Sequence, residues 1–274
     1  MRVLVVGKGP VARVLATSLA ERHQVGFAVR EQTADSLLVE TRRHRTARRT
    51  VALTTAGEGW DVVISTASPA SPGVAGLLAR PAVVAAVTQV PSEVELLREL
   101  AGDRPWGLVV PGFFAGGADP TWWWPQARFT VAGPASDVLR SLFARPQPTA
   151  PLAAPLVSAA ATMPVVAGLH AADFDLATAR HSSPQLAAAA TQARDAVAAG
   201  FGGPRPRPVS RHAVRAALTV LPRLAPFDVP HYLRSHFGGH GEQTVRMLRD
   251  WVDLGRRHGL PTDELDALLG RVPA

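Results

Sequence analysis

The chain has 274 residues, 47% of them hydrophobic, and a mean hydropathy of +0.09, which excludes a disordered protein and suffices for two domains with buried cores. It has no cysteine, which excludes disulfides, thiolate metal sites and a thiol nucleophile. The formal charge of +7 is accompanied by no nucleic-acid motif and no aromatic-interleaved basic run, so we expect no nucleic-acid partner and favour an anionic small molecule.

The first 147 residues alternate strand-like and helix-like segments, which is typical of a parallel sheet with crossover helices. Residues 36–55 resemble a two-stranded excursion from this sheet. The expected strands are 2–6, 25–30, 61–66, 82–87, 107–111 and 128–132, and the expected helices are 10–22, 72–79, 92–101 and 135–144.

Beyond residue 147 the strand signals vanish and helical periodicity continues to the end of the chain. The sequence therefore predicts an α/β fold with a Rossmann-type dinucleotide-binding domain at 1–147 and an all-helical substrate and dimerisation domain at 148–274. Residues 151–169 approach membrane-spanning length, but three prolines and many alanines favour a buried helix. Since no signal peptide is evident, we expect a cytoplasmic protein without a membrane partner.

A glycine-rich turn, VVGKGPVA, follows the first strand and leads into the first helix. Gly7, Gly9 and Ala12 form the G-x-G-x-x-A pattern of dinucleotide sites, in which the second glycine lets the backbone approach a pyrophosphate. Pro10 suits the first helical position, and a helix N-terminus favours an anion. Lys8, the only lysine in the chain, either lies along the phosphates or projects into water.

Arg30 stands at the end of the second strand, where an NAD site usually carries an acidic residue. An arginine there pairs with a 2′-phosphate, so the sequence favours NADP (NADPH) over NAD. Arg42 and Arg43 either assist or lie on a solvated strand edge.

This arrangement of an N-terminal GxGxxA unit, an arginine after the second strand, a short β excursion and a helical second half resembles the ketopantoate reductase family. DVVISTASPAS at 61–71 is similar to the family's fourth main strand and its following loop, which adds Thr66 and Ser68 to the expected cofactor site. TQVPSEVELL at 88–97 is similar to the segment N-G-x-x-x-x-E-x-L, and residues 243–262 are similar to the closing helix.

The catalytic residues that this resemblance implies are replaced. The family lysine that protonates the new alkoxide would fall near Ala154 or Pro155, and no other lysine can stand in for it because Lys8 is the only one. The family asparagine falls on Gln89, and the lysine after the fourth strand falls on Ser68. The glutamate that binds the substrate hydroxyl falls on Gln243, with Glu242 beside it. The usual reduction of ketopantoate is therefore not expected.

Residues 228–244, DVPHYLRSHFGGHGEQT, hold candidates for the missing proton donor. By the family's layout this segment lies at the cleft between the domains. His236 or His231 could act as general acid, because a histidine titrates near neutral pH, or each could instead cap or pack a helix. A metal site of His236, His240 and Glu242 is disfavoured, because two glycines separate the histidines, so we expect no metal.

Residues 112–125, GFFAGGADPTWWWP, combine five aromatics with a flexible turn after a strand. They either line an apolar pocket, which would suit a substrate larger and more hydrophobic than ketopantoate, or pack against the helical domain.

Three functions remain open on these grounds. One is an NADPH-dependent reductase of a hydrophobic carbonyl, imine or enone. Another is a non-redox cyclase or isomerase of natural-product biosynthesis that uses the interdomain pocket without a cofactor. The third is a binding or sensing protein that no longer performs redox chemistry.

Overall fold

The computed structural model describes residues 1–28, 37–41, 45–49, 59–117, 121–238 and 241–273. The chain forms two units, Met1–Leu152 and Ala153–Ala274. The sequence predicts the boundary between the two domains at residue 147. The structure divides the chain five residues later because Thr149–Ala150 form a strand, β11, that pairs with β10 (Phe129–Ala132) and so belongs to the first unit.

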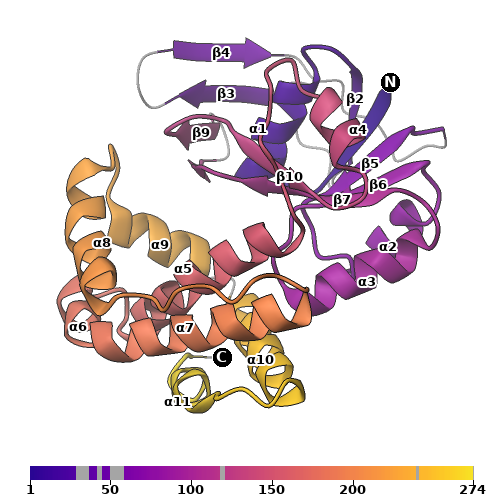
Figure 1. Cartoon of the computed structure of the whole chain (residues 1–274). Coiled ribbons are helices and arrows are strands. Elements are labelled where there is room, and N and C mark those ends of the chain that lie inside the picture. Colours follow the sequence, from indigo (N-terminus) through magenta and orange to yellow (C-terminus); the bar gives the residue numbers. More distant parts are fainter. Residues whose placement is uncertain (29–36, 42–44, 50–58, 118–120, 239–240, 274) are drawn as a thin grey trace. The chain divides into compact units, whose positions relative to one another are not determined.

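A seven-stranded sheet forms the centre of the first unit within the described residues, in the order β11-β10-β7-β6-β5-β1-β2 (Figure 1). Five neighbouring strands of it are parallel, as the sequence predicts: β2 (Gln24–Ala28), β1 (Arg2–Val6), β5 (Val62–Ser65), β6 (Val83–Ala86) and β7 (Trp106–Pro111). β10 differs from these strands, because it is antiparallel to β7. The connection between these two strands contains a β-hairpin in place of a crossover helix, and an antiparallel partner needs no crossover.

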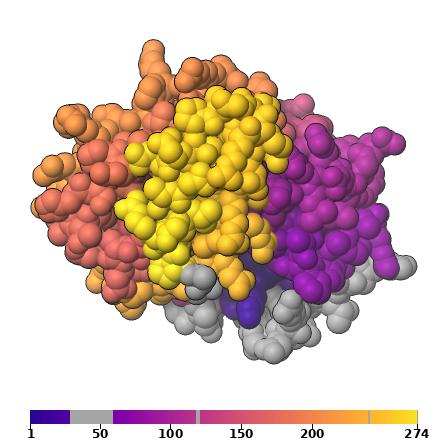
Figure 2. All heavy atoms as spheres, turned by 90° about the horizontal axis from the view of Figure 1, so that it is seen from below, coloured from indigo at the N-terminus to yellow at the C-terminus, as the bar shows by residue number. Residues whose placement is uncertain are grey.

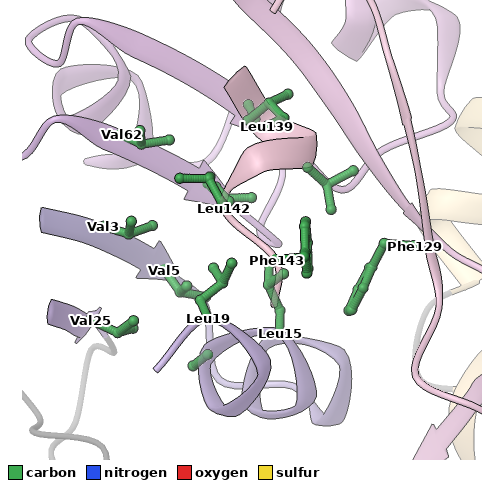
Figure 3. Close-up of a cluster of buried hydrophobic side chains, with 14 of the residues drawn as sticks. Val3, Val5, Leu15, Leu19, Val25, Val62, Phe129, Leu139, Leu142 and Phe143 are labelled. Atoms are coloured by element: carbon green, nitrogen blue, oxygen red, sulfur yellow. The ribbon is translucent and has the colours of Figure 1, made fainter. Parts of the chain in front are cut away.

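Helices cover the faces of this sheet. α2 (Val74–Leu78) and α3 (Pro91–Ala101) contact β5, β6 and β7, whereas α1 (Pro10–Leu19) contacts β1 and β2, and α4 (Ser136–Ser141) contacts β7 and β10. Figure 3 shows Leu15 and Leu19 of α1 directed towards Val5 and Phe143 in a buried apolar cluster. This burial holds α1, and with it the glycine turn that precedes α1, against the sheet.

A second sheet of the first unit, in the order β4-β3-β9-β8 within the described residues, also contacts α1 (Figure 1). The predicted two-stranded excursion is confirmed as the antiparallel pair β3 (Leu37–Thr41) and β4 (Arg45–Arg49). The aromatic segment was expected as a turn. It forms two strands instead, β8 (Phe114–Gly116) and β9 (Thr121–Trp124), and β9 pairs with β3.

The aromatic side chains of this segment contact the first unit itself. Phe113 meets the buried Phe129 edge to face, with ring centroids 5.1 Å apart, and Trp123 packs against the same apolar cluster. Trp122 lies over Gly116, where a Cβ atom would come within 2.6 Å of the indole. Phe113 and Trp123 therefore pack against the apolar cluster of the first unit, and Trp122 covers Gly116 of the neighbouring strand.

The second unit contains only helices among its described elements, which confirms the predicted fold class. They are α5 (Ala153–Ala171), α6 (Leu176–His181), α7 (Ser183–Gly200), α8 (Arg211–Leu224), α9 (Val229–Phe237), α10 (Gly241–Arg257) and α11 (Asp263–Leu269). α7 is central, because α5, α8, α10 and α11 all contact it. The carboxyl-terminal helices α10 and α11, yellow in Figure 2, form one face of this unit.

α5 is the one helix of the described residues that is long and apolar enough to cross a membrane. Half of its apolar window is buried within the protein, chiefly by contact with α7. At Gly168 the two helices come so close that an added Cβ atom would lie 2.2 Å from Leu186 of α7. α5 is thus packed as a core helix of its unit, as the sequence predicts.

Candidate functional site

The carboxyl ends of β1 and β5 carry most of the cofactor residues that the sequence predicts. β1 lies between β2 and β5, and the chain passes from β1 to β2 and only later returns to β5 on the other side. The strand order therefore reverses between β1 and β5, and ligands of open α/β sheets bind outside the carboxyl ends of the strands at such a point. Gly7 directly follows β1, and Thr66 directly follows β5.

Gly7 is fixed by its contacts with the protein. Its φ of 127° lies in a region that favours glycine, and its N–H donates to the Ala28 carbonyl at 3.0 Å. A Cβ atom here would lie 2.1 Å from Oγ1 of Thr66. This hydroxyl donates to the Val6 carbonyl at 3.0 Å, so Thr66 joins the ends of the two strands across the switch point.

Gly9 differs from Gly7 in its backbone conformation and in the space around its Cα atom. Its φ of −71° and ψ of 167° suit any residue, and a Cβ atom added to it would meet nothing within 4 Å. Neither the backbone nor the packing of the described residues therefore requires a glycine at this position. Gly9 is exposed, and we call the open space beside its Cα atom the cradle.

The N-terminus of α1 opens at this cradle. Gly9 is the N-cap and supplies no side-chain cap, and no acidic residue lies in the first turn of the helix. Pro10 occupies the first helical position, and the buried Ala12 lets the helix pack closely on the sheet. The helix end therefore presents amide N–H groups and a positive dipole to an anion, and the exposed Lys8 adds a full charge next to them.

The loop after β5 is held by its own hydrogen bonds. Ser65 donates from its hydroxyl to the Ala67 carbonyl at 2.8 Å, and the Ser68 hydroxyl accepts the Ala70 N–H at 3.3 Å. Ser68 is half-buried and lies three residues after Ser65, the last residue of β5. Its short hydroxyl occupies the place where the resemblance expects a lysine.

The loop after β6 contains a buried polar pair that the sequence did not predict. Thr88 donates to a carboxylate oxygen of Glu93 at 2.5 Å, and both residues are at least 95% buried. The Thr88 hydroxyl also accepts the Val90 N–H at 3.2 Å, where Val90 is the N-cap of α3. The half-buried Gln89 lies between these anchored residues. Pro91 at the helix start followed by an acidic residue in its first turn was the available signal for this pair.

The histidines proposed as proton donors lie in the second unit, on α9. His231 is exposed, and its backbone N–H is capped by Asp228 at 2.9 Å. His236 is half-buried, and its ring stacks on Tyr232 with centroids 5.5 Å apart and meets Phe237 edge to face at 4.8 Å. His236 is therefore the histidine held in an aromatic setting, whereas His231 extends into solvent.

Glu242 and Gln243 lie in the first turn of α10, and both side chains are exposed. The described residues contain no cluster of three or more acidic or histidine side chains able to hold a metal ion. The candidates Arg30, Arg42, Arg43 and His240 lie outside the described residues.

The structure thus brings together Gly7, Gly9 and Thr66 at one edge of the sheet and places Gln89 at the end of the next strand. The other predicted group, His231, His236, Glu242 and Gln243, belongs to the second unit.

Comparison with known proteins agrees with this architecture. No family model and no curated protein sequence matches the chain. Solved structures do match over its whole length. They include a 2-dehydropantoate 2-reductase from Geobacter metallireducens, with a TM-score of 0.74, 14% identity and coverage of 99% of both chains. A dimeric ketopantoate reductase from Staphylococcus aureus has a TM-score of 0.68, 14% identity and coverage of 99% of this chain and 97% of its own.

A D-mandelate dehydrogenase whose structure was solved with NADH also matches, with a TM-score of 0.72, 12% identity and coverage of 99% of this chain and 97% of its own. At such identities the likeness defines the fold. The resemblance expected from the sequence is therefore confirmed at this level: the chain has the two-part fold of the ketopantoate reductases, a Rossmann-type sheet unit followed by a helical unit.

Proposed function

We propose that this protein is an NADPH-dependent reductase of a hydrophobic carbonyl, imine or enone compound other than ketopantoate. The observation that carries the proposal is Gly9, a glycine that the described protein does not itself require, beside open space at the N-terminus of α1 and at the switch point of the sheet. A dinucleotide explains that glycine, because its pyrophosphate approaches the backbone at this position.

The residues present fit the dinucleotide. Gly7, Gly9 and the first amides of α1 would receive the pyrophosphate, and Lys8 would add a point charge to it. Thr66 and Ser68 would line the next part of the cofactor site. When bound, the reduced nicotinamide supplies a hydride. The preference for NADPH depends on the sequence position of Arg30, two residues beyond the end of β2, where its guanidinium would pair with a 2′-phosphate.

The proton that a reduced oxygen or nitrogen needs must come from another group, because the chain has no lysine besides Lys8. We assign this donation to a ring N–H of His236, with His231 as the second candidate. The contacts with Tyr232 and Phe237 support this choice, since they limit the orientations of the His236 ring. Gln89, Gln243 and Glu242 would orient polar groups of the substrate without donating the proton.

Titration with NADPH and NADH, followed by tryptophan fluorescence, tests the cofactor part of the proposal. NADPH should bind with a Kd in the micromolar range or below, on the order of −8 kcal/mol, and NADH more weakly. Arg30→Asp should weaken NADPH binding and leave NADH binding unchanged or stronger. Equal losses for both cofactors would contradict the assignment of Arg30.

Oxidation of NADPH in the presence of hydrophobic 2-oxo acids, aryl ketones, cyclic imines and enones tests the reaction. Once a substrate is found, His236→Gln should lower kcat by about 10²–10⁴-fold with little effect on NADPH binding. Unchanged turnover would remove His236 from the mechanism and direct the test to His231.

The absence of the family's lysine also favours a second candidate, a cofactor-free cyclase or isomerase of natural-product biosynthesis on this scaffold. Failure of both NADPH and NADH to bind would support it against the reductase. In either case we propose a cytoplasmic protein that forms a homodimer, as the Staphylococcus aureus neighbour does.

A further inference from the structure

The turn between β6 and α3 presents one side chain outward among buried neighbours. Thr88 is 5% exposed, Val90 is 0% exposed, and Pro91 is buried as well. Gln89 is half-buried, so it is the residue of positions 88–91 that reaches the protein surface. The turn follows a parallel strand at its carboxyl end, where ligands of α/β sheets bind. Gln89 is therefore the side chain through which this turn can contact a ligand.

Thr88 and Glu93 fix the conformation of this turn. The Thr88 hydroxyl donates to the Glu93 carboxylate at 2.5 Å and accepts the Val90 N–H at 3.2 Å. The Val90 carbonyl accepts the Glu93 N–H at 3.1 Å. The Thr88 side chain thus joins the first turn of α3 to the backbone directly after Gln89. Because Thr88 and Glu93 are both buried, these hydrogen bonds are shielded from water and hold the turn in place.

The same turn is joined to the switch point of the sheet. The Val87 N–H donates to the Ser65 carbonyl at the end of β5, at 2.7 Å, and the Thr66 N–H donates to the Val6 carbonyl at the end of β1, at 2.8 Å. β1, β5 and β6 are neighbours in the sheet (Figure 1), so the ends of β1 and β6 lie about 10 Å apart. An extended dinucleotide is longer than this distance and can therefore reach from the glycine turn to the end of β6.

Under the proposed function, the strand order assigns the two halves of the dinucleotide to opposite sides of β1. Arg30, the residue proposed for the 2′-phosphate, follows β2 in the sequence. The adenosine half would then lie on the β2 side of the glycine turn, and the nicotinamide half on the side of β5 and β6. The Gln89 amide offers both a donor and an acceptor, so it can pair with the carboxamide or the ribose hydroxyls of that half.

We propose that Thr88 and Glu93 are positioning residues, whose buried hydrogen bond holds Gln89 against the nicotinamide half of the bound cofactor. The inference rests on the proposed function, because it needs a dinucleotide at the glycine turn. Thr88 and Glu93 do not touch the cofactor themselves and act through Gln89.

Calorimetric titration with NADPH and with 2′,5′-ADP separates this role from a general loss of structure, because 2′,5′-ADP contains the adenosine 2′-phosphate half and no nicotinamide. Thr88→Val removes the donor to Glu93 and should weaken NADPH binding about three- to tenfold, roughly the effect of one hydrogen bond, and change the 2′,5′-ADP Kd by less than about twofold. Thr88→Ser should restore the NADPH affinity. Thr17→Val is the matched control, because it removes a buried hydroxyl in α1 that bonds only within its own helix, and it should leave both affinities within about twofold.

A double substitution tests whether the pair acts through Gln89. Gln89→Ala should weaken NADPH binding by a factor similar to that of Thr88→Val. Adding Thr88→Val to Gln89→Ala should then change the NADPH Kd by less than about twofold, because two residues that act through one contact have non-additive effects. If Thr88→Val does not fold, Glu93→Gln takes its place in both experiments, since it keeps the size of the side chain and weakens the same hydrogen bond.

Three results would each overturn this inference and leave the proposed function intact. They are an unchanged NADPH Kd in Thr88→Val, a loss of 2′,5′-ADP affinity as large as that of NADPH, and losses that multiply in the double variant. Failure of the unmodified protein to bind NADPH would overturn the proposed function and this inference with it.

Discussion

Gly7 and Gly9 offer a matched pair of substitutions that separates the needs of the fold from those of a ligand. Both changes to alanine add one methyl group to the same turn, two residues apart. Because only Gly7 is enclosed by protein atoms, we expect Gly7→Ala to lower the stability of the protein, and Gly9→Ala to weaken cofactor binding without lowering stability.

For Gly9→Ala we expect almost no change in the free energy of unfolding. Alanine is a poorer N-cap than glycine, which costs about 0.5–1 kcal/mol. The reduced freedom of the unfolded chain offsets this by about 0.4–1 kcal/mol, because φ and ψ at Gly9 suit alanine. The net change should lie within about 0.5 kcal/mol. NADPH binding should weaken at least tenfold, about 1.4 kcal/mol, because the methyl group occupies the path of the pyrophosphate.

For Gly7→Ala we expect a clear loss of stability. The positive φ costs an alanine about 1–2 kcal/mol. The methyl group must also displace the Thr66 hydroxyl, whose hydrogen bond to the Val6 carbonyl contributes about 0.5–1.5 kcal/mol. Together these effects lower the free energy of unfolding by about 1.5–3.5 kcal/mol.

Urea unfolding followed by tryptophan fluorescence measures the stability of both variants, and titration with NADPH measures the binding. A Gly9→Ala variant that binds NADPH as tightly as the unmodified protein would refute the assignment of the cradle to the pyrophosphate. A Gly9→Ala variant destabilised as strongly as Gly7→Ala would refute the premise that the protein does not itself require this glycine.

Three further predictions concern the first unit. Burial, aided by the N-terminal amino group, lowers the pKa of the His23 imidazole, so the unfolded chain takes up this proton first. The neutral His23 of the folded protein therefore costs no stability above pH about 6.5, and the free energy of unfolding falls as the pH drops from there towards the lower pKa of the folded state. His23→Gln should make the melting temperature less sensitive to pH in this range. An unchanged dependence of the melting temperature on pH would contradict this role of His23. Gly107→Ala should destabilise the protein by about 1–3 kcal/mol, because its methyl group would lie 2.6 Å from the Ala132 carbonyl oxygen of β10, and a wild-type urea midpoint would show that the strands can separate at little cost. Thr88→Val should cost about 1.5–3 kcal/mol in urea unfolding, because it removes a donor to the buried Glu93 carboxylate, whereas Thr88→Ser should keep most of the stability; equal losses would indicate that packing, and not the hydroxyl, matters there.

The sequence predicted the parallel strands and the glycine turn because their signals are local. Each buried strand of the first sheet is a short apolar run, and the turn is marked by two glycines and a proline. The β8–β9 hairpin was missed because its strand character depends on pairing with β3, about eighty residues earlier in the chain. β11 has only two residues, too few for any periodicity.

The motif residues of the candidate site could be predicted from the sequence, but the contacts between its loops could not. The positions of Gly7, Gly9 and Pro10 follow from the motif, but the difference between an enclosed Gly7 and an open Gly9 depends on Thr66, which lies in another loop. The helix that carries Glu93 was predicted within one residue of its start, but the Thr88–Glu93 pair depends on how α3 packs on the sheet, which buries both side chains.

The short strand β11 bears on how the sheet unit could be studied as a fragment. The Val131 N–H of β10 donates to the Pro148 carbonyl, and the buried Gln147 side chain accepts the Phe129 N–H at 2.8 Å. A chain that ends at 147 would lose the first of these bonds and expose the edge of β10, whereas one that ends at 152 keeps both. The fragment that ends at 152 is thus the better choice for measuring nucleotide affinity without the helical unit. A lower solubility of the fragment that ends at 147 would show that the two residues of β11 protect the edge of the sheet.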